Sequence, residues 1–299
     1  MTTFPKPTAI LLATDLSARS DRAQARAVQL ARQWQASLVV LVALTEETTF
    51  SRANAYQDDE APVDAPAAET PAAYFERRAR QALADAGVPV LVCVLQGKPG
   101  PLAVDTARQY GCGLIVTGSS RSDVAMRMEP GSTLRWLARN AGVPVLAVND
   151  RVHADYRQLT MASDFSPASE AALQLADAWF SDVAQRTLLH AYTIPLPTLS
   201  LDDHARVEAL AALQAQTEGN ARTHLSQALG AGAAHWQLDV RAGGPVRLLR
   251  EHAREAGTDL TVIASHGRSK LLDKLVGSVA ERLLETVGTD LLVVRPLLA

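Results

Sequence analysis

The chain carries two copies of one sequence pattern, and this repeat limits the possible folds more than any other feature. Residues 8–17, Thr-Ala-Ile-Leu-Leu-Ala-Thr-Asp-Leu-Ser, return as residues 157–166, Arg-Gln-Leu-Thr-Met-Ala-Ser-Asp-Phe-Ser. In both segments an apolar run ends in a small residue, an aspartate, one further residue and a serine. Because a repeat of this length contains a whole structural unit, we expect two similar domains, residues 1–150 and residues 151–299.

The ends of the two copies repeat as well. A common spacing, here called the glycine frame, is shared by residues 118–132 and 264–278. In each segment a small residue, Gly118 or Ala264, is followed at the same distance by a glycine-serine pair. Each frame leads through a helical pattern to an apolar run, at 143–148 and at 290–294. Each copy has the size of an ordinary domain and can bury a core without disulfides.

Within each copy, short apolar runs alternate with alanine-rich stretches of helical period, which is typical of a parallel sheet covered by helices. The predicted strands of the first copy are 9–13, 37–44, 89–95, 113–117 and 144–148, and its predicted helices are 18–35, 71–86, 100–110 and 132–141. The predicted strands of the second copy are 158–162, 187–192, 235–241, 259–263 and 290–294, and its predicted helices are 167–183, 203–229, 246–256 and 278–287. We therefore expect an α/β fold.

Charge and apolar runs disfavour two classes of partner. The 29 basic and 32 acidic residues give a net charge of −3, and no basic run is dense enough to follow a polyanion, so we expect no nucleic acid partner. The longest apolar run, 36–44, is too short to span a bilayer, and no signal-peptide pattern begins the chain. We expect a cytoplasmic protein with no membrane partner. Cys93 and Cys112 are expected to be buried reduced thiols, with a redox pair as the alternative.

Two aspartates stand where a parallel sheet binds ligands. Asp15 and Asp164 each follow the first strand of their copy, and ligands of open parallel sheets lie at the carboxyl ends of strands. A carboxylate there can accept hydrogen bonds from a ribose hydroxyl or hold water or a cation. The structural alternative is helix capping, by Asp15 or Ser17 in the first copy and by Ser166 ahead of Pro167 in the second.

The repeated glycine frame predicts a phosphate site. Gly267 allows a close backbone approach, and Gly277-Ser278 opens a helix whose unpaired N–H groups attract anions. The alternative is a capping box formed by Ser278 and Glu281, which we expect to be present in any case. Residues 265–276 carry a net charge of +2, whereas residues 119–130 are neutral, so electrostatics favours the second copy.

These motifs together resemble the universal stress protein family, here as a tandem pair. The resemblance rests on the small-Asp-x-Ser turn, the Gly-x-x-Gly-x9-Gly-Ser spacing and the closing Leu-Leu-Val-Val-Arg295 run, and it covers nearly the whole chain. It implies a five-stranded parallel sheet of order 3-2-1-4-5 with helices on both faces in each domain. It also implies intramolecular pairing of the two domains in place of the family's usual homodimer; a further homodimer stays open.

The resemblance further implies an adenine nucleotide ligand, ATP, with magnesium as an optional companion ion. In the second copy the implied binding residues are Ala162, Ser163, Asp164, Ala191, Ala264, Gly267, Arg268, Gly277, Ser278 and Val279. In the first copy, implied as the weaker site, they are Ala13, Thr14, Asp15, Ala43, Gly118, Gly131, Ser132 and Thr133. Both copies depart from the family motif. Arg121 replaces the second glycine of the first copy, where it fills the site or adds a charge to it, and Ala264 replaces a glycine, which matters only if φ there is positive.

Three functions compete at this point. The leading hypothesis is a cytoplasmic stress-response protein regulated by ATP bound in the second domain. The alternative is a tandem interaction or scaffold module whose sites have decayed. An enzyme is the third, and we expect no catalytic residues and no metal ligands, because nucleotide-hydrolase and hydrolase motifs are missing and the histidines lack a ligating spacing. Slow ATP hydrolysis stays open.

Overall fold

The structure is a computed structural model that describes residues 4–18, 20–45, 69–119, 132–265 and 277–295. Every strand and helix predicted from the sequence is present within these ranges, and the α/β class is confirmed. None of the helices in the described ranges combines the length and the apolar character that crossing a bilayer requires.

The first half of the chain (residues 1–150) contains five strands and four helices in the described ranges. The strands are β1 (Ala9–Thr14), β2 (Ser37–Leu44), β3 (Val90–Gln96), β4 (Leu114–Gly118) and β5 (Val145–Val148). The helices are α1 (Asp21–Trp34), α3 (Pro71–Ala82), α4 (Pro99–Gln109) and α5 (Ser132–Asn140).

The second half (residues 151–299) repeats this order. Its strands are β6 (Gln158–Ala162), β7 (Gln185–Tyr192), β8 (Trp236–Ala242), β9 (Leu260–Ala264) and β10 (Asp290–Val294). Its helices are α6 (Pro167–Trp179), α7 (Leu196–Leu199), α8 (Asp203–Leu229), α9 (Pro245–Ala256) and α10 (Ser278–Thr286), with a 3-10 turn η1 (Gly230–His235) before β8. The short elements α7 and η1 have no counterpart among the predicted ones.

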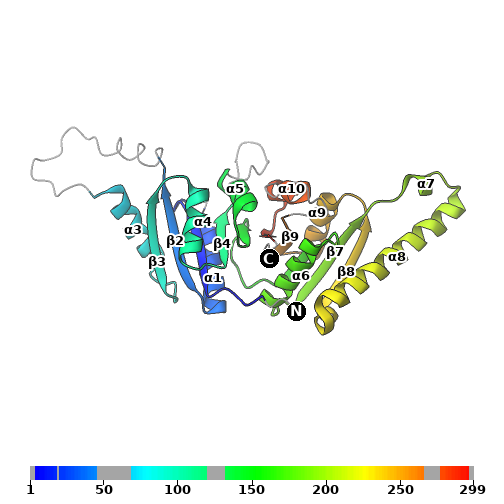
Figure 1. The fold of residues 1–299 in the computed structure, drawn as a ribbon, viewed down its shortest axis with the longest axis horizontal. Coiled ribbons are helices and arrows are strands. Elements are labelled where there is room, and N and C mark those ends of the chain that lie inside the picture. The colour runs from blue at the N-terminus through cyan, green and yellow to red at the C-terminus, as the bar shows by residue number, and fades with distance from the viewer. Residues whose placement is uncertain (1–3, 19, 46–68, 120–131, 266–276, 296–299) are drawn as a thin grey trace, which may run out of the picture.

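The strands form one continuous sheet of order β3-β2-β1-β4-β5-β10-β9-β6-β7-β8 (Figure 1). Within each half the order is the predicted 3-2-1-4-5, and neighbouring strands are parallel. Among the described strands, β5 and β10 form the one antiparallel pair, with Leu292 opposite Leu146. The two predicted sheets are therefore merged at their fifth strands.

Alternation along the strands sends side chains to two separate cores. Ile10 and Leu12 of β1 belong to the core on the face covered by α1, α3, α6 and α8, whereas Leu11 belongs to the core on the face covered by α4, α5, α9 and α10. All three leucine and isoleucine side chains are fully buried. Helices on both faces explain why the strands are apolar throughout rather than alternating with polar residues.

A buried carboxylate ties the two halves together beside the β5–β10 pair. Asp290 Oδ1 accepts hydrogen bonds from the backbone N–H groups of Asn149 and Asp150, at 2.8 and 3.1 Å. Its Oδ2 accepts from Arg26 Nε at 3.1 Å and from the Tyr156 hydroxyl at 2.7 Å. The Arg26 and Asp290 side chains are only 5% and 0% exposed, and the guanidinium lies 3.9 Å from the Tyr156 ring centroid. One second-half carboxylate thus joins helix α1 to the segment between β5 and β6.

Helices α5 and α10 also face each other across the junction, and their charges are opposite. Arg135 pairs with Glu285 at 3.1 Å, and Arg139 pairs with Glu281. The four side chains are between 40% and 46% exposed. Each exposed pair contributes little to stability, but the pattern favours contact between unlike halves.

Candidate functional site

The turn after β1 is held by the side chains of the repeated small-Asp-x-Ser motif. The Thr14 hydroxyl accepts a hydrogen bond from the N–H of Leu16 at 3.0 Å, and Asp15 Oδ1 accepts one from the N–H of Ser17 at 2.9 Å. The Ser20 hydroxyl donates to Asp15 Oδ1 at 2.9 Å. Leu16 has a φ of 55°, an unfavourable value for a leucine, and the flanking hydrogen bonds hold it there.

The helix-cap alternative for Asp15 and Ser17 is wrong. The N-cap of α1 is Ser20, and the helix begins at Asp21 rather than at residue 18. The oxygen of Asp15 is engaged by the turn and by the Ser20 hydroxyl, so it does not reach the amides of the first helical turn. The sequence predicted a capping group at this place, but the extra turn residues shift the cap along the chain.

Asp15 carries its charge at neutral pH. Burial favours the neutral acid, but hydrogen bonds from Ser17 and Ser20 favour the carboxylate and outweigh it, so the pKa of Asp15 lies below its ordinary value. A charged acceptor at the end of a strand suits hydroxyl donors, such as those of a sugar, and repels phosphate.

The turn after β6 repeats this construction in the second half. Asp164 Oδ1 accepts from the N–H of Ser166 at 3.0 Å, and the Ser163 hydroxyl accepts from the N–H of Phe165 at 3.2 Å. Phe165 has a φ of 59°, close to the 55° of its counterpart Leu16 in the first half. The cap predicted at Ser166 is confirmed, because its hydroxyl accepts from the N–H of Ser169 at 3.2 Å.

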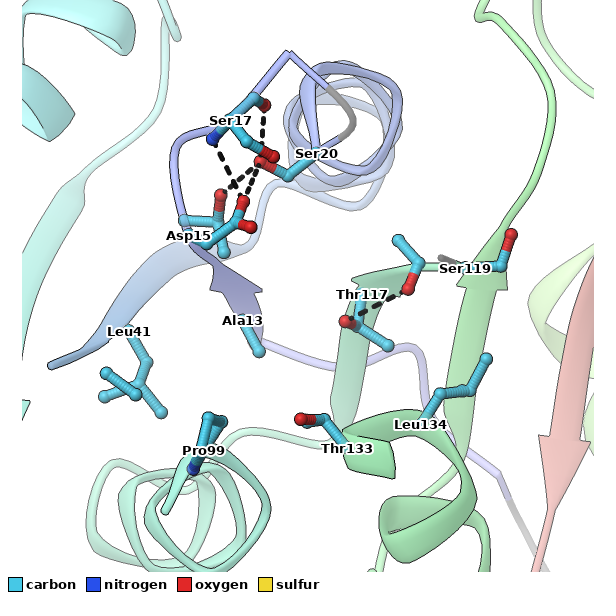
Figure 2. Close-up of a pocket in the computed structure, with 13 residues that line it drawn as sticks. Ala13, Asp15, Ser17, Ser20, Leu41, Pro99, Thr117, Ser119, Thr133 and Leu134 are labelled. Carbon is cyan, nitrogen blue, oxygen red and sulfur yellow. Dashed lines mark hydrogen bonds between the residues drawn. The ribbon is translucent and has the colours of Figure 1, made fainter. Parts of the chain in front are cut away.

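A pocket opens beside the first of these turns, at the carboxyl ends of β1, β2 and β4 (Figure 2). Its volume is about 290 Å³, close to the lower end of the range for small-molecule sites, roughly 300–1,000 Å³. The residues that line this first-half pocket are Ala13, Thr14, Asp15, Ser17, Ser20, Leu41, Ala43, Pro99, Thr117, Gly118, Ser119, Thr133 and Leu134.

The lining of the first-half pocket is divided between apolar carbon and hydroxyl groups. Figure 2 shows Leu41, Ala13 and Pro99 on one side of the opening and Thr117 and Thr133 on the other. Asp15 is the one charged residue among the described lining residues, and no lysine or arginine is among them. An uncharged, flat group with a hydroxylated portion fits this lining better than a bare polyanion.

The structure brings six of the eight first-half residues predicted from the sequence around this pocket. They are Ala13, Thr14, Asp15, Ala43, Gly118 and Thr133. Ser132 opens α5 next to the pocket without lining it. Gly131 and Arg121 lie outside the described residues, so the alternatives for Arg121 stay open. That these residues bind nucleotide remains a prediction.

Several lining residues escaped the sequence analysis. Leu41 lies two positions before Ala43 on β2, and the period of a strand puts both on one face, which is a signal that the sequence did contain. Thr117 stands in the same relation to Ser119 at the end of β4. Pro99 comes from the first turn of α4, and nothing in its local sequence connects it with the motifs.

The corresponding positions of the second half are more apolar. The pairing of β6 with β9 places Ile263 beside Ala162, where the first half has Thr117 beside Ala13. The frame likewise replaces Thr133 by Val279. These exchanges remove two hydroxyl groups from the wall of any second-half site.

Ala264 does not obstruct the second half through its backbone. It ends β9 and pairs with Val294, so its φ is that of an ordinary strand residue and its methyl group is a mild change from glycine. The next residue, Ser265, is fully buried and accepts a hydrogen bond from the N–H of Gly277 at 2.7 Å. Gly267 and Arg268 lie outside the described residues.

The predicted capping box at Ser278 is wrong. The N-cap of α10 is Gly277, with a φ of −58°, and no side chain caps the helix. Glu281 pairs with Arg139 of the first half instead of reaching back to the helix start. The sequence of the helix alone could not show this competing partner. Among the described residues no side chain accepts from the amides at the start of α10, as a phosphate site there would need.

Ser163 and Asp164 lie beside a stacked pair of rings, those of Phe165 and His190. The Phe165 ring stacks on His190, with ring centroids 4.0 Å apart, and His190 Nδ1 is 2.8 Å from the Ser163 carbonyl oxygen. Ala191 follows on β7. Burial lowers the pKa of His224, whose ring centroid is 4.9 Å from that of Phe165. Among the described residues no group of histidine, cysteine and acidic side chains could hold a metal.

Comparison with known proteins agrees with the duplicated geometry. The sequence pattern of the universal stress protein family matches residues 8–149 and again residues 155–295. The chain belongs to the universal stress protein family. A universal stress protein of Mycolicibacterium smegmatis is 28% identical over 199 residues, which are 61% of this chain and 62% of that protein.

Solved structures show the same tandem fold. A protein of unknown function from Pseudomonas aeruginosa PAO1 matches with a TM-score of 0.71 at 18% identity, over 97% of this chain and 93% of the other. A universal stress protein from Archaeoglobus fulgidus DSM 4304 matches with a TM-score of 0.66 at 15% identity, over 96% and 98%. These likenesses concern the fold of a tandem universal stress protein.

Proposed function

We propose that this universal stress protein binds an adenine nucleotide as a regulatory ligand, and that the first-half pocket takes the base and the ribose. The observation that carries the proposal is the pocket itself, with its apolar wall beside a charged Asp15. An adenine ring suits the wall formed by Leu41, Ala43 and Pro99, and the ribose hydroxyls suit the carboxylate.

The second half keeps its place as a further candidate. The sequence favours it for the phosphates because of the charge of residues 265–276, of which the structure describes only Ser265. Its turn at Asp164 repeats that of the first half, whereas Ile263 and Val279 make its wall more apolar. These apolar exchanges support the rival function, an interaction module without a nucleotide. Regulation in the cytoplasm under stress is part of the proposal.

Matched substitutions in the two halves test the site. Ala43→Phe and Ala191→Phe place the same ring at equivalent, half-buried positions of β2 and β7. Isothermal titration of the full chain with ATP and magnesium, and separately with adenosine, measures the affinity. We expect Ala43→Phe to weaken adenosine and ATP binding by at least about tenfold and Ala191→Phe to leave adenosine binding unchanged.

Other outcomes separate the competing functions. Gly277→Val is a backbone-neutral change at a φ of −58°, so a loss of ATP binding in this variant alone would move the nucleotide to the second half. An unfolding midpoint that millimolar ATP and magnesium do not raise would support the interaction module, because a ligand of the folded state raises it. Release of inorganic phosphate measures the slow hydrolysis that the sequence leaves open.

A further inference from the structure

Strand β3 ends the ten-stranded sheet at the first-half side (Figure 1). Its inner edge pairs with β2 from Val90 to Gln96, and no strand of the described residues pairs with its outer edge. Such an edge offers a row of backbone donors and acceptors to another strand, and proteins usually protect it with charges, prolines or bulges. The sequence of β3, Val-Leu-Val-Cys-Val-Leu-Gln, contains none of these charges or prolines.

The backbone directions along β3 follow from its pairing with β2. The N–H of Leu38 donates to the Pro89 carbonyl at 2.8 Å, and the N–H of Gly97 donates to the Leu44 carbonyl at 3.0 Å. In a parallel pair alternate residues point their backbone groups at the neighbour. The odd-numbered residues of β3 therefore face β2, and Val92 and Val94 point their N–H and C=O groups outward.

An exposed apolar strip runs along this edge on the face covered by α4. Leu91 and Leu95 are 41% and 39% exposed, and Cys93 between them is partly exposed. Tyr110, at the end of α4, is 38% exposed, and a hydrogen bond with the Cys93 thiol raises the pKa of this tyrosine. Leucines this open, next to a strand edge that no described strand pairs with, mark a surface that another protein covers.

The other end of the sheet shows the opposite chemistry at the same positions. On β8 the register puts Asp239 where β3 has Cys93, and Arg241 where β3 has Leu95. Asp239 accepts from His252 at 2.7 Å, and Arg241 donates to Asp239 and to Glu255 at 2.8 and 2.9 Å. The second half thus protects its edge with a charged network, and the first half does not.

The order of residues on β3 identifies the partner. The segment Leu91-Val92-Cys93-Val94-Leu95 reads the same in both directions. We propose that two copies of this protein pair through β3, antiparallel, about a two-fold axis at Cys93. Leu91 of one copy then lies opposite Leu95 of the other, and the strand brings no charge against its counterpart.

Charge favours this β3–β3 pair over pairing of β3 with the other sheet edge, β8. Pairing of β3 with β8 of a second copy would place Asp239 and Arg241 against Cys93 and a leucine, and it would continue into an open filament. Pairing of β3 with itself avoids both. Because the interface is one strand wide, we expect a dissociation constant in the micromolar range, roughly that of weak transient interfaces.

The backbone directions fix the geometry at the two-fold axis. Cys93 points its N–H and C=O at β2, so it forms a non-hydrogen-bonded pair with Cys93 of the second copy, with Cα atoms about 4.5 Å apart. Val92 and Val94 of the two copies exchange the hydrogen bonds. That Cα separation lies within the roughly 4.4–6.8 Å span of disulfides.

Mass and cross-linking of the full chain test the proposal. Sedimentation at tens of micromolar should give twice the chain mass of 31.9 kDa. Diamide, which takes up the two electrons and two protons of a thiol pair, should convert this dimer into a covalent one. We expect cross-linking in Cys112→Ser, whose native thiol is 3% exposed, and none in Cys93→Ser. A chain that stays monomeric at 100 µM, or a cross-link that needs Cys112, overturns the proposal.

A charge on the strip should abolish the dimer without unfolding the chain. We expect Leu95→Lys to weaken dimerisation by at least about tenfold, whereas the matched control Leu199→Lys, at a 50% exposed site on α7, keeps it. Circular dichroism confirms that both variants are folded. Val94→Pro gives a second measure, since it removes one outward N–H without breaking the β2 ladder. A dimer that survives both Leu95→Lys and Val94→Pro, or species that grow beyond two copies, refutes pairing through β3.

Discussion

Removing the Asp290 carboxylate should destabilise the protein severely. Asp290→Ala leaves the Arg26 guanidinium, whose side chain is 5% exposed, without its buried partner. Breaking a buried pair in this way costs about 3–5 kcal/mol. The N–H groups of Asn149 and Asp150 lose their acceptor as well. Arg26 keeps a hydrogen bond to the Ala154 carbonyl at 3.2 Å, which limits the total, so we expect a loss of about 4 kcal/mol.

Urea unfolding followed by tryptophan fluorescence measures the free energy of unfolding that Asp290→Ala removes. Two of the four tryptophans, Trp34 and Trp179, come from opposite halves, with ring centroids 5.4 Å apart, so their share of the emission reports on the junction. The matched control is Asp182→Ala, which breaks another ion pair between the halves, to Lys6, at a carboxylate that is 91% exposed. We expect less than about 0.5 kcal/mol for this control.

A double-mutant cycle decides whether the loss comes from the ion pair. With Arg26→Ala in the background, Asp290→Ala should cost about 2 kcal/mol less than it does alone, because the charge it strands is already gone. If the two substitutions are additive, or if Asp290→Ala alone costs below about 1 kcal/mol, the carboxylate does not stabilise the junction as its contacts indicate.

The remaining predictions concern the turn, a thiol and the helix pair. Because the pKa of Asp15 is lowered in the folded chain, its carboxylate stabilises the fold at pH values above the unfolded pKa of about 3.9, and this stabilisation is lost as the pH falls through the folded pKa. In urea titrations Asp15→Asn should therefore destabilise the chain at pH 7 and do so progressively less below pH 4. Burial is the main cause that raises the pKa of Cys112 to about 11, and Cys93 is the second. The burial remains in Cys93→Ser, so in this variant the Cys112 thiol should still react with a disulfide reagent at pH 8 at least about ten times more slowly than a free thiol; rapid reaction would contradict its burial. Arg135→Glu should lower the free energy of unfolding by about 0.2–1 kcal/mol, and adding Glu285→Arg to this variant should restore the lost stability. Equal losses in the single and the double variant would show that the pair does not contribute to stability.

The strands and their order could be predicted because local pattern determines them. Apolar runs such as Leu38–Val42 are buried from both sides, and the repeat aligns each half with the other. The fusion of the sheets could not be predicted in the same way. Asp290 contacts Asn149, which is 141 positions away in the sequence. The first-half residue equivalent to Asp290 is Pro144, so the repeat does not predict this contact.

The candidate site was predictable where motifs touch strand ends and not elsewhere. Asp15 and Ala43 reach the first-half pocket because they end β1 and β2, as the topology requires. Pro99 reaches it through the packing of α4, which depends on distant residues. The sequence of α10 by itself predicts a cap at Ser278, but Glu281 pairs with Arg139 of the opposite half.

The opposite charges of α5 and α10 bear on how the chain is made. The first half leaves the ribosome before the second, with Arg135 and Arg139 exposed and their glutamate counterparts not yet translated. Two nascent first halves on one messenger would meet arginine to arginine and repel each other. This repulsion would disfavour pairing between unfinished chains and would favour assembly of each first half with its own second half.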